Sequence, residues 1–314
     1  MSENVATDSR ILTVSKNRKF KNLYMYILIA PALISTLLFG YFPLSGLLIS
    51  FKDYDVLAGF FGSDWVGFKH FIEIFKIPNF FAAVRRTVIY SSVCLFGQFP
   101  FPILLAIMIN EVRSKYAKKV VQTISYLPHF LSWMSVIGIA YSMFSKMGAY
   151  NDLMSKIFGE GYERTNILLD SKNFIGVLFF SGLWKTIGWS SIIYFAAICG
   201  IDQNLYEAAD IDGCGRIGKI WHITLPGIKT TCIMILIMSI GSLVNSNFEQ
   251  VYGFQNVYIQ ADTDVINTLT YREGIQSGHY SEATALGAAQ GLVSFLLVMS
   301  ANYISKKLSD QSLW

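Results

Sequence analysis

The sequence predicts an all-α integral membrane protein with six transmembrane helices, on three observations. Hydrophobic residues make up 53% of the chain and charged residues only 15%, whereas soluble domains carry about 25% charged residues. Six stretches approach or exceed the roughly 20 mostly apolar residues that a spanning helix needs. Lysine and arginine are concentrated on one side of these stretches, as in multi-pass membrane proteins.

Each predicted span is an apolar run bounded by polar, charged or helix-breaking residues. The third is the shortest, and we expect it to extend into its flanks. Prolines in the first two spans should kink the helices, which membrane bundles tolerate. The first run is too long for a signal peptide and lacks a small-residue cleavage site. The spans are expected at about Tyr24–Ile49, Thr87–Ile109, His129–Phe144, Phe174–Gly200, Ile228–Asn247 and Thr284–Ile304.

The distribution of basic residues predicts that both termini are cytoplasmic. With the N-terminus inside, the inside segments carry 14 lysines and arginines and the longer outside segments carry 10. Residues 1–23 then form a cytoplasmic tail, and residues 24–314 form the membrane domain. The three outside loops, at about 50–86, 145–173 and 248–283, are rich in aromatic residues. These suit a membrane-interface belt, but also a docking surface or a platform for a sugar.

The inside loop 201–227 has the pattern of two short helices joined by a sharp turn. Residues 205–211 form a helical pattern with small side chains, and Asp202 or Asn204 is a plausible N-cap. Gly213 and Gly215 are expected to supply the backbone freedom of the turn. A second amphipathic helix follows, and Pro226 marks the start of the fifth span. Such a helix–turn–helix, called the helical knob here, suits docking into a cleft of another protein. An interhelical loop that lies on the membrane surface would have the same pattern.

This loop carries a family resemblance. The spacing of Glu207-Ala208-Ala209, Gly213 and Ile223-Thr224-Leu225-Pro226 matches the EAA motif of permease subunits of binding-protein-dependent ABC importers. Nearly all of the chain after about residue 20 resembles the polysaccharide-type sugar permeases of that superfamily. The other matching stretches are Phe51–Tyr54, Trp65–Gly67, Asn110–Glu111, Gln122–Phe130, Gly188–Tyr194, Phe248–Val251 and Leu313–Trp314.

The resemblance implies a type I ABC importer permease bundle in a bacterial plasma membrane, with the EAA loop docked on an ATP-binding subunit. Glu207 would make a polar contact there, the two alanines would allow close packing, and Gly213 would form the turn. Ile223, Leu225 and Pro226 would anchor the second short helix. The coupling residues implied are Glu207, Ala208, Ala209, Asp210, Gly213, Ile223, Leu225 and Pro226.

The resemblance also implies that the helices beside this loop line the path of the substrate. Tryptophan rings can stack on sugar faces, and amides and hydroxyls can bind sugar hydroxyls. The same side chains can instead face lipid or hold helices together. The predicted path residues are Trp184, Lys185, Gly188, Trp189, Tyr194, Ser239, Ser242, Asn245, Ser246 and Asn247.

Lys185 is the only charged residue well inside a predicted span. A charge there is costly, so it should face the bundle interior or water and have a partner. Two interpretations stay open. Lys185 contacts the substrate or a gate, which would suit an acidic sugar, or its side chain reaches to the outer membrane interface.

No chemistry of its own is expected for this chain. The four histidines have no metal-ligand spacing, and the four cysteines indicate neither a disulfide nor a zinc site. The GxxxG at Gly287 and Gly291 suggests tight helix packing. The chain has no Walker-type phosphate loop, so no catalytic residue, metal or cofactor is assigned, and ATP and Mg²⁺ would bind to partner subunits.

The predicted function is the transmembrane path of an ATP-driven importer for an oligo- or polysaccharide, working by alternating access. Its expected partners are a second EAA-type permease, two ATP-binding subunits, an extracellular or lipoprotein binding protein, the sugar and the lipid bilayer. The sequence has no basic stripe interleaved with aromatic residues, so nucleic acid is not expected as a partner. Alternatives are an ABC permease for an amino acid, a peptide or an anion, a stand-alone secondary transporter or channel, and a membrane-embedded enzyme. Stand-alone secondary transporters often have inverted repeats; we detect none in this sequence, which argues against that alternative. A membrane-embedded enzyme would need a cluster of acid–base or metal-binding residues in its spans, where only Lys185 is found.

Overall fold

The computed structural model describes residues 23–309 and divides into two units, Met1–Leu48 and Ile49–Trp314. The predicted cytoplasmic tail lies outside the described residues except for Leu23. The match at Leu313–Trp314 also lies outside them.

The first unit confirms a helix where the first span was predicted. α2 (Leu23–Thr36) contains Pro31 and continues into a π-helical segment, Leu37–Tyr41, and a 3₁₀ segment, Phe42–Phe51, whose end belongs to the second unit. The stretch Met25–Phe51 is long and apolar enough to cross a membrane.

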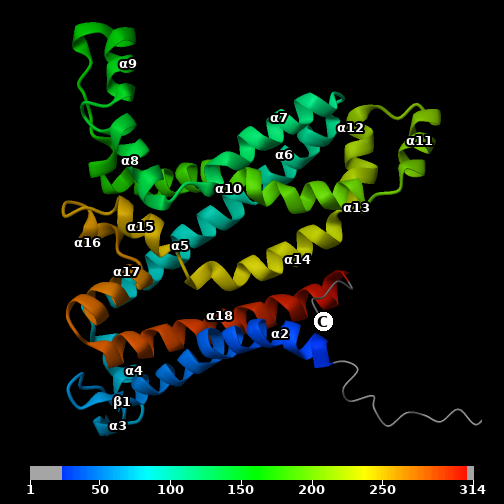
Figure 1. Cartoon of the computed structure of the whole chain (residues 1–314). Coiled ribbons are helices and arrows are strands. Elements are labelled where there is room, and N and C mark those ends of the chain that lie inside the picture. Colours follow the sequence, from blue (N-terminus) through cyan, green and yellow to red (C-terminus); the bar gives the residue numbers. More distant parts are fainter. Residues whose placement is uncertain (1–22, 310–314) are drawn as a thin grey trace, which may run out of the picture. The chain divides into compact units, whose positions relative to one another are not determined.

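The second unit is built around long helices (Figure 1). α10 packs against α5, α6 and α7, while α14 packs against α18. α5 and α6 form one helical stretch, interrupted at Phe99 where Pro100 begins α6. The long helices are α5 (Phe80–Gln98), α6 (Pro100–Glu111), α7 (Lys115–Tyr126), α8 (Trp133–Phe144), α10 (Phe174–Cys199), α14 (Lys229–Ile240) and α18 (Tyr280–Ser309).

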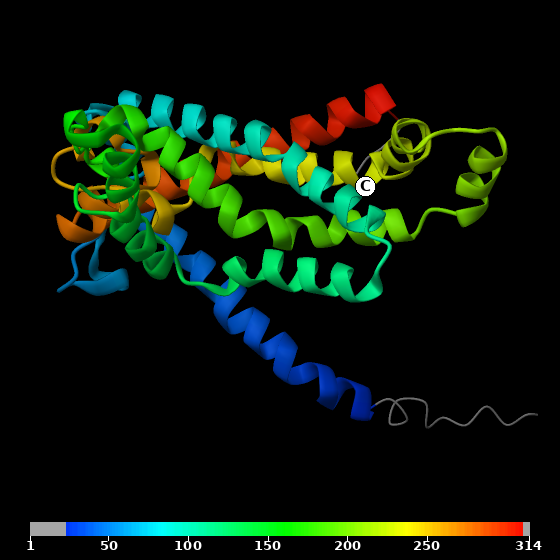
Figure 2. The ribbon, with the colours of Figure 1, turned by 90° about the horizontal axis from the view of Figure 1, so that it is seen from above.

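Short elements gather at the two ends of this unit, as Figures 1 and 2 show. At one end lie α11 (Gln203–Ile211), α12 (Arg216–Lys219) and α13 (Leu225–Gly227), with a π-helical turn, Ile220–Thr224, before α13. At the other end lie the antiparallel strands β1 (Lys52–Asp53) and β2 (Asp64–Trp65), which pair Lys52 with Trp65. The helices there are α3 (Gly59–Gly62), α4 (Lys69–Glu73), α9 (Ala149–Phe158), α15 (Phe248–Phe254), α16 (Gln260–Thr263) and α17 (Ile266–Thr270).

By length and composition, three described helical stretches can cross a membrane, and up to five can if each of two bent helix pairs counts as one span. α10 is not among them, because Lys185 and several small polar residues dilute its apolar character. It nevertheless has 26 residues, which at about 1.5 Å per residue is long enough for a bilayer core.

The prediction for the third span is wrong at its start, whereas its end at Phe144 is confirmed. Its helix begins at Trp133 rather than His129, and the residues before it form a separate helix, Lys115–Phe130, bent by 99° from the helical stretch that follows. The chain breaks at Leu131 and Ser132, where Ser132 is extended and caps α8 by accepting a hydrogen bond from the Ser135 amide at 3.2 Å. α7 was missed because it is amphipathic, with three lysines at its start.

Three buried apolar clusters hold the second unit together. One joins α8, α10 and α15, and a second joins α6 and α10 to the start of α14. The third joins the 3₁₀ segment Ile74–Lys76, which follows α4, to α5, α17 and α18 through Ile74, Phe80, Leu269 and Leu286. Among the described residues, a Cβ at Gly287 or Gly291 would meet nothing within 4 Å, so the tight packing that this GxxxG suggests is not made there.

Candidate functional site

The loop 201–227 forms a compact helical knob beyond the ends of the long helices (Figure 2). Asp202 is its N-cap, as predicted, and accepts a hydrogen bond from the Asn204 amide at 3.0 Å. Gly213 makes the turn with a φ of +72°, a region that glycine enters without steric cost. The expectation for Gly215 is wrong: it is extended, with a φ of −71°, and caps α12.

Two side-chain contacts fix the two halves of the knob to each other. Asp210 on α11 forms an ion pair with Lys219 on α12. The Tyr206 hydroxyl lies 2.9 Å from the Thr224 hydroxyl. Thr224 is buried, so the second contact joins α11 to the base of the knob.

The knob leaves an apolar and acidic face uncovered in this chain. Glu207 and Ala208 are exposed, and three large apolar side chains beyond them, Ile211, Ile217 and Trp221, are 87%, 73% and 66% exposed. Exposed apolar groups beside polar ones are typical of interaction sites. The helical knob therefore has the surface of a docking element.

The predicted anchors of the knob differ in burial. Leu225 packs against the buried cluster of α6, α10 and the start of α14. Ile223 is half-buried and Pro226 is exposed. α13 and α14 are parted at Ile228, and the two helical stretches around it are bent by 57°.

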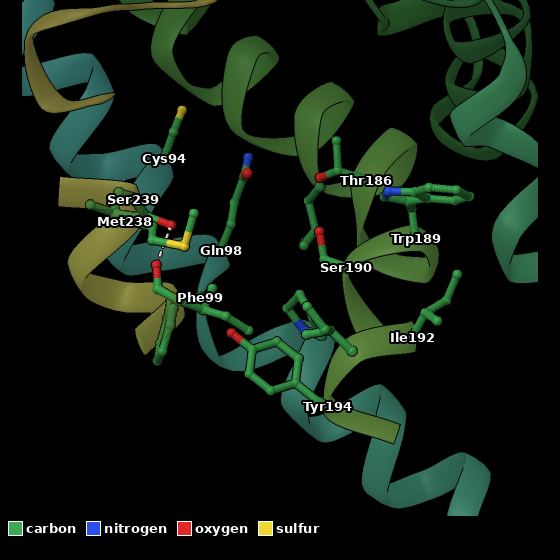
Figure 3. Close-up of a pocket in the computed structure, with 15 residues that line it drawn as sticks. Cys94, Gln98, Phe99, Thr186, Trp189, Ser190, Ile192, Tyr194, Met238 and Ser239 are labelled. Carbon is green, nitrogen blue, oxygen red and sulfur yellow. Dashed lines mark hydrogen bonds between the residues drawn. The ribbon is translucent and has the colours of Figure 1, made fainter. Parts of the chain in front are cut away.

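Two cavities follow α5, α10 and α14 and share part of their lining. The first, of about 460 Å³, is called the polar cavity here. The second, of about 630 Å³, is the apolar cavity (Figure 3). Both are lined by Cys94, Leu95, Gln98, Thr186 and Ser239, which makes them neighbouring parts of one path.

The polar cavity brings together five of the ten predicted path residues: Ser239, Ser242, Asn245, Ser246 and Asn247. Neighbouring side chains fix several of these groups. The Asn247 carboxamide accepts a hydrogen bond from the Gln250 backbone N–H at 3.1 Å, and the Asn267 side chain donates to the Asn245 carboxamide at 2.7 Å. The cavity is thus walled by ordered, uncharged polar groups.

The polar cavity also contains residues that the sequence analysis missed, above all Gln98, Gln250 and Ser91. The Gln98 amide donates to the Phe179 carbonyl at 2.7 Å, and the Gln250 amide donates to the Leu178 carbonyl at 2.7 Å. Both amides therefore lie against α10. An amide side chain in the middle of the second predicted span was the available signal for Gln98, because polar groups at membrane depth have partners or functions.

Two hydroxyls in this cavity have no partner within the described chain. The hydroxyl oxygens of Ser91 and Ser246 are buried and make no hydrogen bond there. Buried polar groups usually have a partner. These two hydroxyls therefore lie without a partner in residues that line the polar cavity.

The apolar cavity contains two more predicted residues, Trp189 and Tyr194 (Figure 3). One face of the Trp189 ring is stacked on His129, with ring centroids 4.5 Å apart and planes 5° apart. Trp184 lies elsewhere: it lines a separate cavity of about 580 Å³ with Met143 and Phe254. The two tryptophans diverge because five residues turn a helix through about 500°, or 140° beyond a full turn.

Lys185 and Gly188 line neither the polar nor the apolar cavity. The Lys185 side chain is buried, and its ammonium donates to the carbonyls of His129, at 2.9 Å, and Leu131. It also lies 5.5 Å from the Trp133 ring. The ammonium thus caps the break before α8, and the interpretation in which it reaches the outer interface does not fit this geometry.

Gly188 permits the close approach of α7 to α10. A Cβ at this position would lie 1.9 Å from the Ser125 carbonyl oxygen. Lys185 and Gly188 together fasten the bent helix pair Lys115–Phe130 and Trp133–Phe158 to α10, beside the cavities.

Comparison with known proteins identifies the family. Residues 98–311 match the family model described as "Binding-protein-dependent transport system inner membrane component". The chain belongs to this family. The resemblance in the helical knob is thereby confirmed, and the chain is a permease component of a binding-protein-dependent importer.

Similar permeases are known along the whole length of the chain. It is 39% identical to Protein LplB of Bacillus subtilis (strain 168), over 98% of each chain. It is 38% identical to YteP of the same organism, a polygalacturonan/rhamnogalacturonan transport system permease, over 98% of this chain and 97% of YteP. A crystal structure of a bacterial ABC transporter that imports the acidic polysaccharide alginate contains a chain 36% identical to this permease, with a TM-score of 0.82 over 92% of this chain and 97% of that one.

Proposed function

We propose that this permease forms part of the transmembrane path for an oligo- or polysaccharide, delivered by an extracellular binding protein. The observation that carries the proposal is its 38% identity over almost the full chain to YteP, whose substrates are polysaccharides. A second solved structure supports it, in which an alginate transporter with a chain 36% identical to this one is bound to a periplasmic protein loaded with an alginate pentasaccharide.

The proposed topology has six spans and both termini in the cytoplasm. The first, second and sixth spans are the three apolar helical stretches, and α10 is the fourth. The two bent pairs are the third and fifth spans. The helical knob and the elements around α4, α9 and α15 lie at opposite ends of the second unit, which agrees with a knob inside and these elements outside.

The proposed complex has a second EAA-type permease and two ATP-binding subunits. The knob docks on one of those subunits through Glu207, Ala208 and the exposed Ile217 and Trp221. ATP and Mg²⁺ bind to those subunits, where ATP is hydrolysed.

The substrate passes through the polar cavity, where amides and hydroxyls bind sugar hydroxyls. No charged residue lines the polar or the apolar cavity in the part of the chain that the structure describes. If the substrate is acidic, its carboxylates therefore meet cations outside these two cavities.

Transport by the co-purified complex in proteoliposomes tests this path. Ser91→Ala and Ser246→Ala should each reduce uptake of the oligosaccharide several-fold, because they remove hydroxyls that the bound sugar would satisfy. Ser300→Ala is the control: this hydroxyl is exposed on α18 and bonds the Leu296 carbonyl of its own helix. Unchanged uptake in both cavity variants would contradict the proposed path.

A further inference from the structure

A cluster of three titratable side chains lies away from the cavities, at the end of the second unit opposite the knob. His70 and Glu73 lie on α4, and Glu282 lies in the first turn of α18. One possible ligand atom from each residue lies within 4.8 Å of the others. The third residue is far along the chain, so the spacing of the histidines gave no sign of the cluster.

His70 is the unusual member of this cluster. Its side chain is only 5% exposed, and neither ring nitrogen makes a hydrogen bond with any residue between 23 and 309. Its Nδ1 atom lies 3.1 Å from a Glu73 carboxylate oxygen, but the direction of approach is not that of a hydrogen bond. A buried imidazole without a hydrogen bond is costly, so a ligand for it is expected here.

The charges of the cluster point to a cation. Glu73 and Glu282 are both half-buried. Neither forms an ion pair with a lysine or an arginine among the described residues; the nearby Lys69 pairs with Asp53 instead. Two carboxylates close together repel each other unless a positive charge lies between them.

We propose that His70, Glu73 and Glu282 bind a divalent transition-metal ion of the zinc type. One imidazole and two carboxylates are a common donor set for such an ion, with metal–ligand distances of about 2.0–2.2 Å. These distances place tetrahedral ligand atoms about 3.3 Å apart. Small side-chain rotations bring the three ligand atoms from their present separations to that spacing.

The metal joins the segment 52–76 to the start of α18. The same two regions already meet through Ser281, whose hydroxyl donates to the Lys52 carbonyl at 2.7 Å and accepts from the Tyr54 amide at 3.0 Å. Next in sequence to Glu73, Ile74 belongs to the same buried apolar cluster as Ala285 and Leu286 of α18. The ion therefore stabilises this contact, and its removal should loosen the segment from α18.

Metal binding is measured on the full-length permease, co-purified with its partner subunits, with any affinity tag removed and after treatment with EDTA. Zinc is titrated into the wild type, and Co²⁺ is added in parallel because its visible absorption reports the ligand set. The wild type should bind about one ion more per permease chain than Glu282→Gln or Glu73→Gln. Since changes outside the direct ligands already cost about 10–100-fold in metal affinity, loss of a ligand should cost at least that much.

His279→Ala is the matched control, since His279 is an exposed histidine at the same end of the unit. It should bind zinc like the wild type. Zinc should also raise the melting temperature of the wild type and of His279→Ala but not that of Glu282→Gln. Equal zinc binding by wild type, Glu73→Gln and Glu282→Gln, or no zinc effect on wild-type melting, would overturn the proposal. Neither result bears on sugar transport through the cavities.

Discussion

At the scale of single residues, Lys185 illustrates how a buried charge can serve the fold of a membrane protein. The sequence showed that a charge in the fourth span needs a partner, and that prediction is confirmed by two carbonyl acceptors. The identity of these acceptors could not be predicted. They become available only because the chain breaks at Leu131 and Ser132, and the break is hidden within an apolar run.

Replacing Lys185 with Met should destabilise the permease by about 1–3 kcal/mol, because two partly buried carbonyls lose their donor. Lys172→Met is the control, as Lys172 is exposed in the segment before α10. Thermal unfolding in nanodiscs should therefore show a lower melting temperature for Lys185→Met and an unchanged one for Lys172→Met. A melting temperature that stays at the wild-type value while substrate affinity falls would instead indicate a direct substrate contact.

A substitution at Gly188 tests the packing of α7 against α10. An added methyl group meets the Ser125 carbonyl oxygen, a backbone atom that cannot move aside easily. Gly188→Ala should therefore cost about 1–3 kcal/mol through overpacking.

Gly176→Ala is the control for this packing, since it lies on the same helix with nothing within 4 Å of the added atom. Alanine should be neutral or slightly stabilising there. Denaturation of the two variants in the same nanodiscs makes the comparison. Equal stability of both would show that α7 does not approach α10 as closely as described.

At the scale of elements, the helical knob is the part that the sequence predicted best. Its N-cap, its turn glycine and its two helices follow from local signals, and Asp202 and Gly213 are confirmed in these roles. Gly215 was misjudged because two nearby glycines look alike in sequence, although only one of them occupies the left-handed region. The Asp210–Lys219 ion pair joins two helices across the turn and has no local signal.

The two glycines of the knob provide a matched test of coupling. An L-residue in place of Gly213 would pay about 1–2 kcal/mol for the left-handed backbone, so Gly213→Ala should reshape the turn and reduce ATPase stimulation several-fold. Gly215→Ala should leave stimulation unchanged, because its backbone is extended and its surroundings are open. Equal losses in both variants would show that the turn geometry does not matter for coupling.

At the scale of the whole molecule, composition and hydropathy predicted a helical membrane protein, and the family match agrees with this. Long apolar helices such as α18 follow from sequence because their pattern is continuous. The bent pairs do not, since each half is short and partly polar. The polar cavity was predicted in part: the run from Ser239 to Asn247 is visible in sequence, whereas Gln98, Ser91 and Gln250 reach it from other elements.

The central claim is that this permease carries a sugar across the membrane in response to ATP hydrolysis transmitted through the knob. The most direct test is the ATPase activity of the co-purified complex in lipid nanodiscs, with its binding protein loaded with neutral or acidic oligosaccharides. We predict stimulation by one class of loaded binding protein in the wild type, and its loss in a Glu207→Arg, Gly213→Trp double variant. If no ATP-binding subunit co-purifies and the double variant transports normally, the account is contradicted.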